Sequence, residues 1–285
     1  YMEEPLYEYI DYQGVINQLA IVQDHRDIQQ FRDLIRQKKV YLADGHHRLA
    51  SSVKLQQDAL QSGRELPPDS FVNYHLMYLT NMCADDLRIL PIHRLLRLPE
   101  ATYNPNPILD RLREYFDFED ITFSRAPIYK QVEGGKYRFG MVAGSLQFCL
   151  QLKNTIDPVR DIPLDLPAAV KGLDYTVLHY YVFDRCFGIP YFEQRGRDEI
   201  SYVKDYGQVV KQAVNYRDRL AFITPGTSMS QMMAVCRSGA LMPQKSTYFY
   251  PKVVCGLVFA SIDDHENESP FDIGFRFSPA AATSP

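Results

Sequence analysis

The segment Asp44-Gly45-His46-His47-Arg48 is the densest group of chemically capable side chains in this sequence. At the start of a helix, free backbone N–H groups and the helix dipole attract anions. Arg48 can grip phosphate oxygens in a bidentate manner, and the two histidines can donate hydrogen bonds or act as acid or base. Asp44 can cap the helix, orient a histidine or hold magnesium beside a phosphate.

The charge pattern of this segment favours a ligand over a purely structural role. Three potentially cationic side chains at a helix N-terminus oppose the helix dipole, so they need a compensating anion. In the structural alternative, Asp44 and other carboxylates supply that charge. We predict instead a phosphate site at Gly45 and Arg48, with His46, His47 and Asp44 as catalytic candidates and Asp44 as the candidate metal ligand. Zinc binding by the histidines is disfavoured, because adjacent helical residues diverge by about 100°.

Two further clusters contain groups that suit an anion. The first runs from Arg88 to Arg94 and places His93 and Arg94 where a strand should end, a common position for ligand groups. An equally good alternative is that these residues are surface charges at the end of an edge strand. The second runs from Met242 to Lys252, and its candidate ligands are Lys245, Ser246 and Thr247. In its alternative reading, Tyr248 and Tyr250 are half-buried strand residues with satisfied hydroxyls.

Apolar periodicity predicts the elements that position these clusters. A buried strand at Val40–Ala43 should run into a helix from His46 that stops at Gly63, after a helix at 27–36. We predict further helices at 108–118, 175–187, 206–217 and 229–237, and strands at 71–81, 87–92, 136–142, 145–152, 220–223 and 252–260. The fold class is therefore α+β, with a mixed sheet and flanking helices.

Composition bounds the protein's class and its partners. The net charge of −4 gives no footprint for nucleic-acid binding, and no apolar run approaches the roughly 18–20 residues that span a bilayer. The five cysteines are scattered, which favours free thiols in a reducing compartment, so we expect a cytoplasmic protein.

The chain begins with Tyr rather than Met, which suggests a fragment. A Pro/Asn-rich stretch at 99–107 predicts domains at 1–100 and 101–285.

Three motifs together resemble one bacterial and archaeal family, catalogued as domain of unknown function 1015. They are Tyr41–Arg48, Asp86–Arg94 and Met242–Lys252, in the family's order. The Asp-Gly-His-His-Arg turn is also similar to the phosphate-binding motif of the ParB/sulfiredoxin-like fold, a group with nucleotide-binding partition proteins, sulfiredoxin and free-serine kinases. That similarity implies a ParB/sulfiredoxin-like N-terminal part, followed by a second α/β part, and a turn that binds nucleotide phosphates.

We therefore expect a nucleotide-dependent phosphotransferase or phosphohydrolase that acts on a small metabolite, with ATP or ADP and magnesium. His93, Arg94, Lys245, Ser246 and Thr247 would complete its pocket if the three motifs converge. The rival hypothesis is a non-catalytic protein that binds or senses a nucleotide or phosphometabolite. In both cases the expected partner is a small molecule, not a membrane or a nucleic acid. A DNA-binding partition protein is disfavoured because no basic recognition helix is visible.

Overall fold

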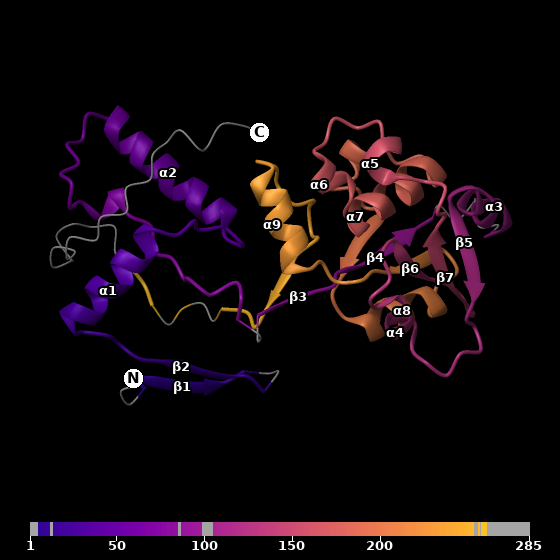
Figure 1. Ribbon diagram of the computed structural model, residues 1–285, viewed down its shortest axis with the longest axis horizontal. Coiled ribbons are helices and arrows are strands. Elements are labelled where there is room, and N and C mark those ends of the chain that lie inside the picture. Colours follow the sequence, from indigo (N-terminus) through magenta and orange to yellow (C-terminus); the bar gives the residue numbers. More distant parts are fainter. Residues whose placement is uncertain are drawn as a thin grey trace. The chain divides into compact units, whose positions relative to one another are not determined.

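The computed structural model describes residues 5–11, 14–84, 87–98, 105–253, 256 and 258–260. The chain forms two units, Tyr1–Asn81 with Pro251–Pro285, and Met82–Tyr250 (Figure 1). The α+β class is confirmed, since helices accompany a multi-strand sheet. The division of the chain differs from the expected one at residue 100, because strands before residue 100 pair with strands from later in the chain.

The second unit is built on a six-stranded sheet with the order β5-β7-β6-β9-β4-β8. Every pair in it is antiparallel, so the expected mixed sheet is an antiparallel one here. The strands predicted at 136–142 and 145–152 are confirmed, and they form an antiparallel hairpin with Gly144 at φ 59° between them. The strands are β4 (His93–Arg97), β5 (Phe116–Asp120), β6 (Arg138–Ala143), β7 (Leu146–Leu152), β8 (Ile200–Val203) and β9 (Arg219–Ile223).

Both faces of this sheet are covered, which explains the unbroken apolar runs of its central strands. In β9, Leu220 and Phe222 face one apolar cluster, while Ala221 and Ile223 face the other. The first cluster includes residues of α3 (Pro105–Tyr115), α7 (Asp174–Val177) and the π-helical segment η3 (Leu178–Cys186). The second includes residues of α4 (Ile128–Val132) and α8 (Tyr206–Asn215), which lie together beside the sheet in Figure 1.

Smaller elements complete the second unit. The strand β3 (Arg88–Leu90) pairs antiparallel with β10 (Tyr248–Tyr250) as a separate two-stranded ladder. The remaining helices are α5 (Pro158–Asp161), α6 (Ala168–Lys171), η4 (Tyr191–Glu193) and α9 (Met229–Arg237). The helices predicted near 175–187, 206–217 and 229–237 are all present.

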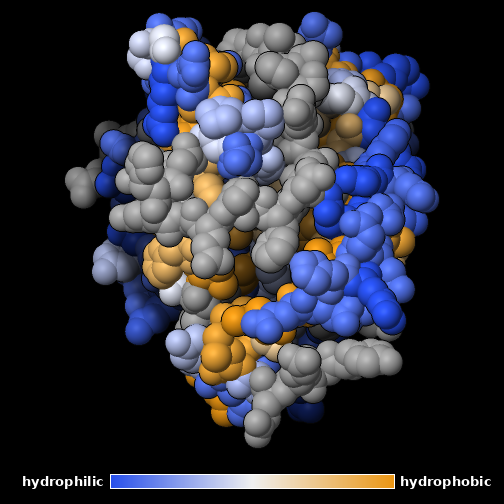
Figure 2. All heavy atoms as spheres, turned by 90° about the vertical axis from the view of Figure 1, so that its left-hand side faces the viewer, coloured by the Kyte–Doolittle hydropathy of each residue, from blue (hydrophilic) through white to orange (hydrophobic). Residues whose placement is uncertain are grey.

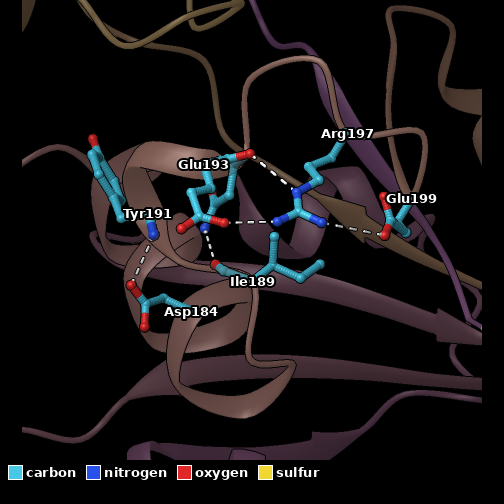
Figure 3. A network of polar contacts seen from close by, with 7 residues as sticks. Asp184, Ile189, Tyr191, Glu193, Arg197 and Glu199 are labelled. Carbon is cyan, nitrogen blue, oxygen red and sulfur yellow. Dashed lines mark hydrogen bonds and ion pairs between the residues drawn. The ribbon is translucent and has the colours of Figure 1, made fainter.

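A polar network fixes the chain that follows η3 (Figure 3). The backbone N–H of Tyr191 donates to Asp184 at 2.8 Å. Arg197 is 2.7 Å from Glu193 and 4.0 Å from Glu199, a bridge across the turn after η4. These exposed pairs contribute little energy individually, but they hold in place the segment that contains Gln194.

The first unit contains a hairpin and two helices. Its elements are β1 (Tyr7–Ile10), β2 (Ile16–Leu19), α1 (His25–Arg36), α2 (His46–Gln61) and η1 (Phe71–Asn73). Asp24 caps α1, since its side chain accepts from the backbone of Arg26 and Asp27. Neither helix contains a buried residue, and Figure 2 shows hydrophobic side chains among hydrophilic ones on this side of the molecule.

Three predicted strands of the first unit are wrong. Residues 40–43 are irregular, with Val40 and Leu42 exposed at 53% and 41%. Residues 71–81 begin as η1 and continue without strand pairing, and the described residues of 252–260 form no strand. A strand needs a neighbour whose backbone groups pair with its own, and no strand ladder in the described part of the chain includes these segments. No helix among the described residues is long and apolar enough to cross a bilayer.

Candidate functional site

The segment predicted to bind an anion lies at the exposed start of a long helix. Helix α2 has 16 residues, and its N-cap Gly45 adopts the left-handed conformation, with φ 83° and ψ 20°. No side chain caps this end of α2 among the described residues, and its first turn contains no acid. The backbone N–H groups of the first turn therefore remain available to an external acceptor.

The guanidinium of Arg48 lies directly against Gly45. A β-carbon built on Gly45 would be 3.1 Å from Nη2 and 3.2 Å from Nε of Arg48. The side chains of His46, His47 and Arg48 are all exposed. Gly45 thus serves two purposes at this position: it accepts the positive φ, and it leaves room for the cationic group beside the turn.

Asp44 does not cap the helix. Its Oδ1 accepts from the Gly45 backbone N–H at 2.9 Å, and its Oδ2 accepts from Lys252 Nζ at 2.8 Å. The hydrogen bond from Lys252, followed by the one from Gly45, holds the pKa of Asp44 below its usual value. The ion pair also brings the last residue of the third motif to the first motif, a contact that the sequence did not reveal.

The second predicted cluster is buried instead of exposed at a strand end. His93 is 2% exposed and Arg94 is 0% exposed. Arg94 Nε donates to His179 Nε2 at 3.0 Å, and its Nη1 donates to the Ile92 carbonyl. Its guanidinium carbon lies 4.3 Å from the centroid of the Tyr175 ring. Within the described residues Arg94 forms no ion pair, so neutral acceptors and aromatic faces hold this buried charge.

His179 is the residue of this cluster that sequence reasoning missed. Its Nε2 accepts from Arg94, so the ring proton resides on Nδ1 and is donated to Gln194 Oε1 at 2.5 Å. Burial, together with the charge of Arg94, lowers the pKa of His179 to about 3. The only sign of its role in the sequence was that it is a single histidine in a helix rich in aromatic residues.

His93 is likewise a neutral, buried side chain. Its Nδ1 accepts from the backbone N–H of Thr224 at 3.3 Å. Burial first, and the charge of Arg94 second, lower its pKa to about 4. His93 and Arg94 therefore belong to the packed interior of the second unit.

The third predicted cluster forms a tight turn ahead of β10. Lys245 is exposed and has a positive φ of 52°, an uncommon conformation for a residue other than glycine. Ser246 is fully buried: its hydroxyl donates to Pro243 O at 2.6 Å, and its carbonyl accepts from Thr227 at 3.2 Å. Thr247 is half-buried. Ser246 thus shapes the turn, and Lys245 remains the exposed cation.

The three motifs meet in pairs. The second and third motifs are joined in the second unit, where Phe249 lies opposite Ile89 in the β10–β3 ladder. The first motif and the end of the third are joined in the first unit by Asp44 and Lys252. No group of three or more metal-ligating side chains occurs among the described residues.

Comparison with known proteins identifies the family. Residues 1–176 match the family described as "Protein of unknown function (DUF1015)". The chain belongs to this family. None of the curated proteins compared with the DUF1015 chain matches it.

Solved structures resemble the DUF1015 chain only weakly. A conserved hypothetical protein from Pyrococcus furiosus has a TM-score of 0.37 and 13% identity, over 79% of this chain and 82% of that one. Free serine kinase in complex with AMP has a TM-score of 0.36 and 14% identity, over 80% and 81%. A mutant of that kinase in complex with ADP has a TM-score of 0.34 and 14% identity, again over 80% and 81%. Likeness at this level carries no argument about a ligand.

Gly45→Ala should weaken anion binding at the predicted site of this DUF1015 protein, and Gly63→Ala is its matched control. Both glycines have positive φ, 83° and 78°, so each substitution should cost about 1 kcal/mol of stability. Only the new methyl at position 45 meets Arg48, because position 63 faces open space. We expect Gly45→Ala alone to lower tripolyphosphate affinity, by about tenfold, in isothermal titration calorimetry. Equal affinities of the two variants would contradict this role for Gly45.

Proposed function

We propose that the turn Gly45–Arg48 binds the phosphates of a nucleotide, and that the protein is a nucleotide-dependent phosphotransferase or phosphohydrolase acting on a small metabolite. One observation carries this proposal. An exposed helix N-terminus without a side-chain cap has a guanidinium beside it, against a glycine in the left-handed conformation. Free N–H donors and a fork of cationic donors are the groups that bind phosphate.

The balance of charge at the turn supports an anionic ligand. His46, His47 and Arg48 are exposed at the positive end of the α2 dipole. Asp44 is the carboxylate of the motif, and it is already paired with Lys252. Asp44 hydrogen-bonds to Lys252 and interacts with Arg48 only through its charge, so the neutralisation of the structural alternative is partial and leaves the free N–H groups and exposed side chains of the first turn for a ligand.

The residues of the turn suit different parts of phosphoryl transfer. The backbone N–H groups and Arg48 would hold the phosphates, while His46 or His47 would move a proton or stabilise charge on the transferred group. Such reactions depend mainly on positioning and electrostatic stabilisation. Magnesium binding at Asp44 would require its carboxylate to exchange Lys252 for the metal.

A nucleotide or phosphometabolite sensor is the second candidate. The observation that favours it is the same ion pair: with Lys252 at 2.8 Å, the Asp44 carboxylate is not directed at either histidine. A sensor needs the anion site but no acid–base group, so it would bind nucleotide and turn none over.

Arg48→Ala should weaken nucleotide binding by about 10- to 100-fold, because it removes a charged hydrogen-bond donor from the site. Lys54→Ala is the matched control: it removes one cation from the same helix, two turns away, where Lys54 pairs with Asp58. Isothermal titration with ADP and ATP, with and without magnesium, measures both variants. Wild-type affinity in Arg48→Ala would overturn the phosphate site.

Release of phosphate from ATP, followed in the same samples, separates the two candidates. In an enzyme, His47→Ala should slow turnover far more than it weakens binding. Binding without any turnover in the wild type, across a panel of small hydroxyl- and amine-bearing acceptors, would support the sensor instead.

A further inference from the structure

Helix α2 also forms one wall of a pocket of about 310 Å³ within the first unit. Leu49, Ser52, Val53 and Gln56 follow the i, i+3, i+4, i+7 spacing and therefore share one face of the helix. The opposite wall comes from residues 66–75, namely Leu66, Pro68, Val72, Asn73, Tyr74 and His75. We propose that this pocket receives the heterocyclic base of the nucleotide, an inference that rests on the proposed function.

Two hydrogen bonds hold the walls together and place amide groups in the pocket. Ser52 Oγ is 2.8 Å from His75 Nδ1, and Gln56 Nε2 donates to Asn73 Oδ1 at 2.8 Å. Asn73 in turn donates to the Pro67 carbonyl at 2.8 Å, which fixes its orientation. Side-chain amides present a donor and an acceptor side by side, the pattern that pairs with the edge of a purine.

The apolar members of the lining suit the faces of a flat ring. Leu49 and Val53 come from α2, and Leu66 and Val72 from the opposite wall. The pocket combines these apolar side chains with polar groups at fixed positions, and small-molecule sites usually contain both kinds of group. Inorganic phosphate or a small phosphorylated metabolite would leave these walls uncovered, whereas a nucleotide would cover them.

The pocket and the proposed phosphate turn share helix α2, and the pocket lining begins at Leu49, directly after Arg48. Ser52 Oγ also lies 3.2 Å from the Arg48 carbonyl, one turn earlier in the helix. Burial, and then the charge of Arg48, lower the pKa of His75, which lines the pocket. From His46 to Gln56 the helix rises about 15 Å, a span that an extended nucleotide can follow from phosphate to base.

The test compares two adjacent glutamines with two probes. Gln56→Leu removes an amide from the pocket, and Gln57→Leu makes the same change at an exposed position outside the lining. We expect Gln56→Leu to weaken ADP binding about tenfold while leaving tripolyphosphate binding unchanged. Gln57→Leu should change neither affinity.

A second pair keeps the test decisive if Gln56→Leu does not fold. Val53→Trp should fill the pocket and exclude the base, whereas Leu55→Trp places the same ring on α2 outside the lining. Wild-type ADP affinity in Gln56→Leu and Val53→Trp, with tripolyphosphate still bound, would overturn the base pocket and leave the phosphate site standing. Failure of the wild type to bind either probe would overturn the proposed function itself.

Discussion

Arg94→Ala should lower the free energy of unfolding by about 3 to 5 kcal/mol, which is the cost of emptying a large buried site and leaving acceptors without their donor. Arg94 is fully buried, and its Nε donates to His179 at 3.0 Å. Its guanidinium carbon lies 4.3 Å from the Tyr175 ring centroid and 4.9 Å from that of Tyr202. Truncation therefore removes packing on two aromatic faces together with two hydrogen bonds.

Two other variants separate the causes of that loss. Arg97→Ala changes the exposed last residue of the same strand, β4, and should cost less than about 0.5 kcal/mol. Arg94→Met keeps much of the buried volume but leaves His179 without its donor, so its loss of unfolding free energy should lie between those of the other two variants. Urea denaturation followed by tyrosine fluorescence measures all three. An Arg94→Ala protein as stable as Arg97→Ala would contradict the buried network.

Acidification from pH 7 to pH 4 should destabilise the fold by roughly 3 kcal/mol for each of His93 and His179. Burial lowers the pKa of His93 to about 4 and that of His179 to about 3, from an ordinary value of 6.5. Between these values and 6.5, the unfolded chain binds more protons than the folded one. The contribution is therefore fully present above pH 6.5 and is lost as the pH falls towards 4.

The variant His93→Gln isolates one histidine in this pH dependence. Glutamine can still accept from the Thr224 backbone N–H, but it does not titrate. Lowering the pH from 7 to 4 should destabilise the wild type by roughly 3 kcal/mol relative to His93→Gln. Other titrating groups contribute equally to both proteins. A constant difference across this range would show that His93 takes up its proton in the folded protein as readily as in the unfolded chain.

Local signals were sufficient for the helices around the candidate site. Helix ends are set by residues that act on the adjacent turn of the chain: Asp24 before α1, and Gly45 and Gly63 at the two ends of α2. Such signals and the elements that they affect are neighbours in the sequence, so both can be read from it. The run at 40–43 failed as a strand for the opposite reason. A strand depends on a partner elsewhere in the chain, and apolar composition alone does not supply one.

The burial of the second motif lay beyond sequence reasoning. Arginine is usually exposed and histidine is intermediate in burial, so the pair His93 and Arg94 suggested a surface position. They are buried because β4 lies between β8 and β9 in a sheet that is covered on both faces. The partner His179 is 85 positions away from Arg94, and only the assembled fold brings the two together.

The proposed binding of phosphates at the start of α2 is tested most directly by amide chemical shifts. Tripolyphosphate and ADP are titrated into isotopically labelled protein, and the backbone N–H signals are followed by two-dimensional NMR. We expect the largest shifts at His46, His47 and Arg48, whose N–H groups lie in the first turn of α2. Unchanged signals from these three residues, while either ligand saturates the protein or shifts signals elsewhere, would contradict this proposal.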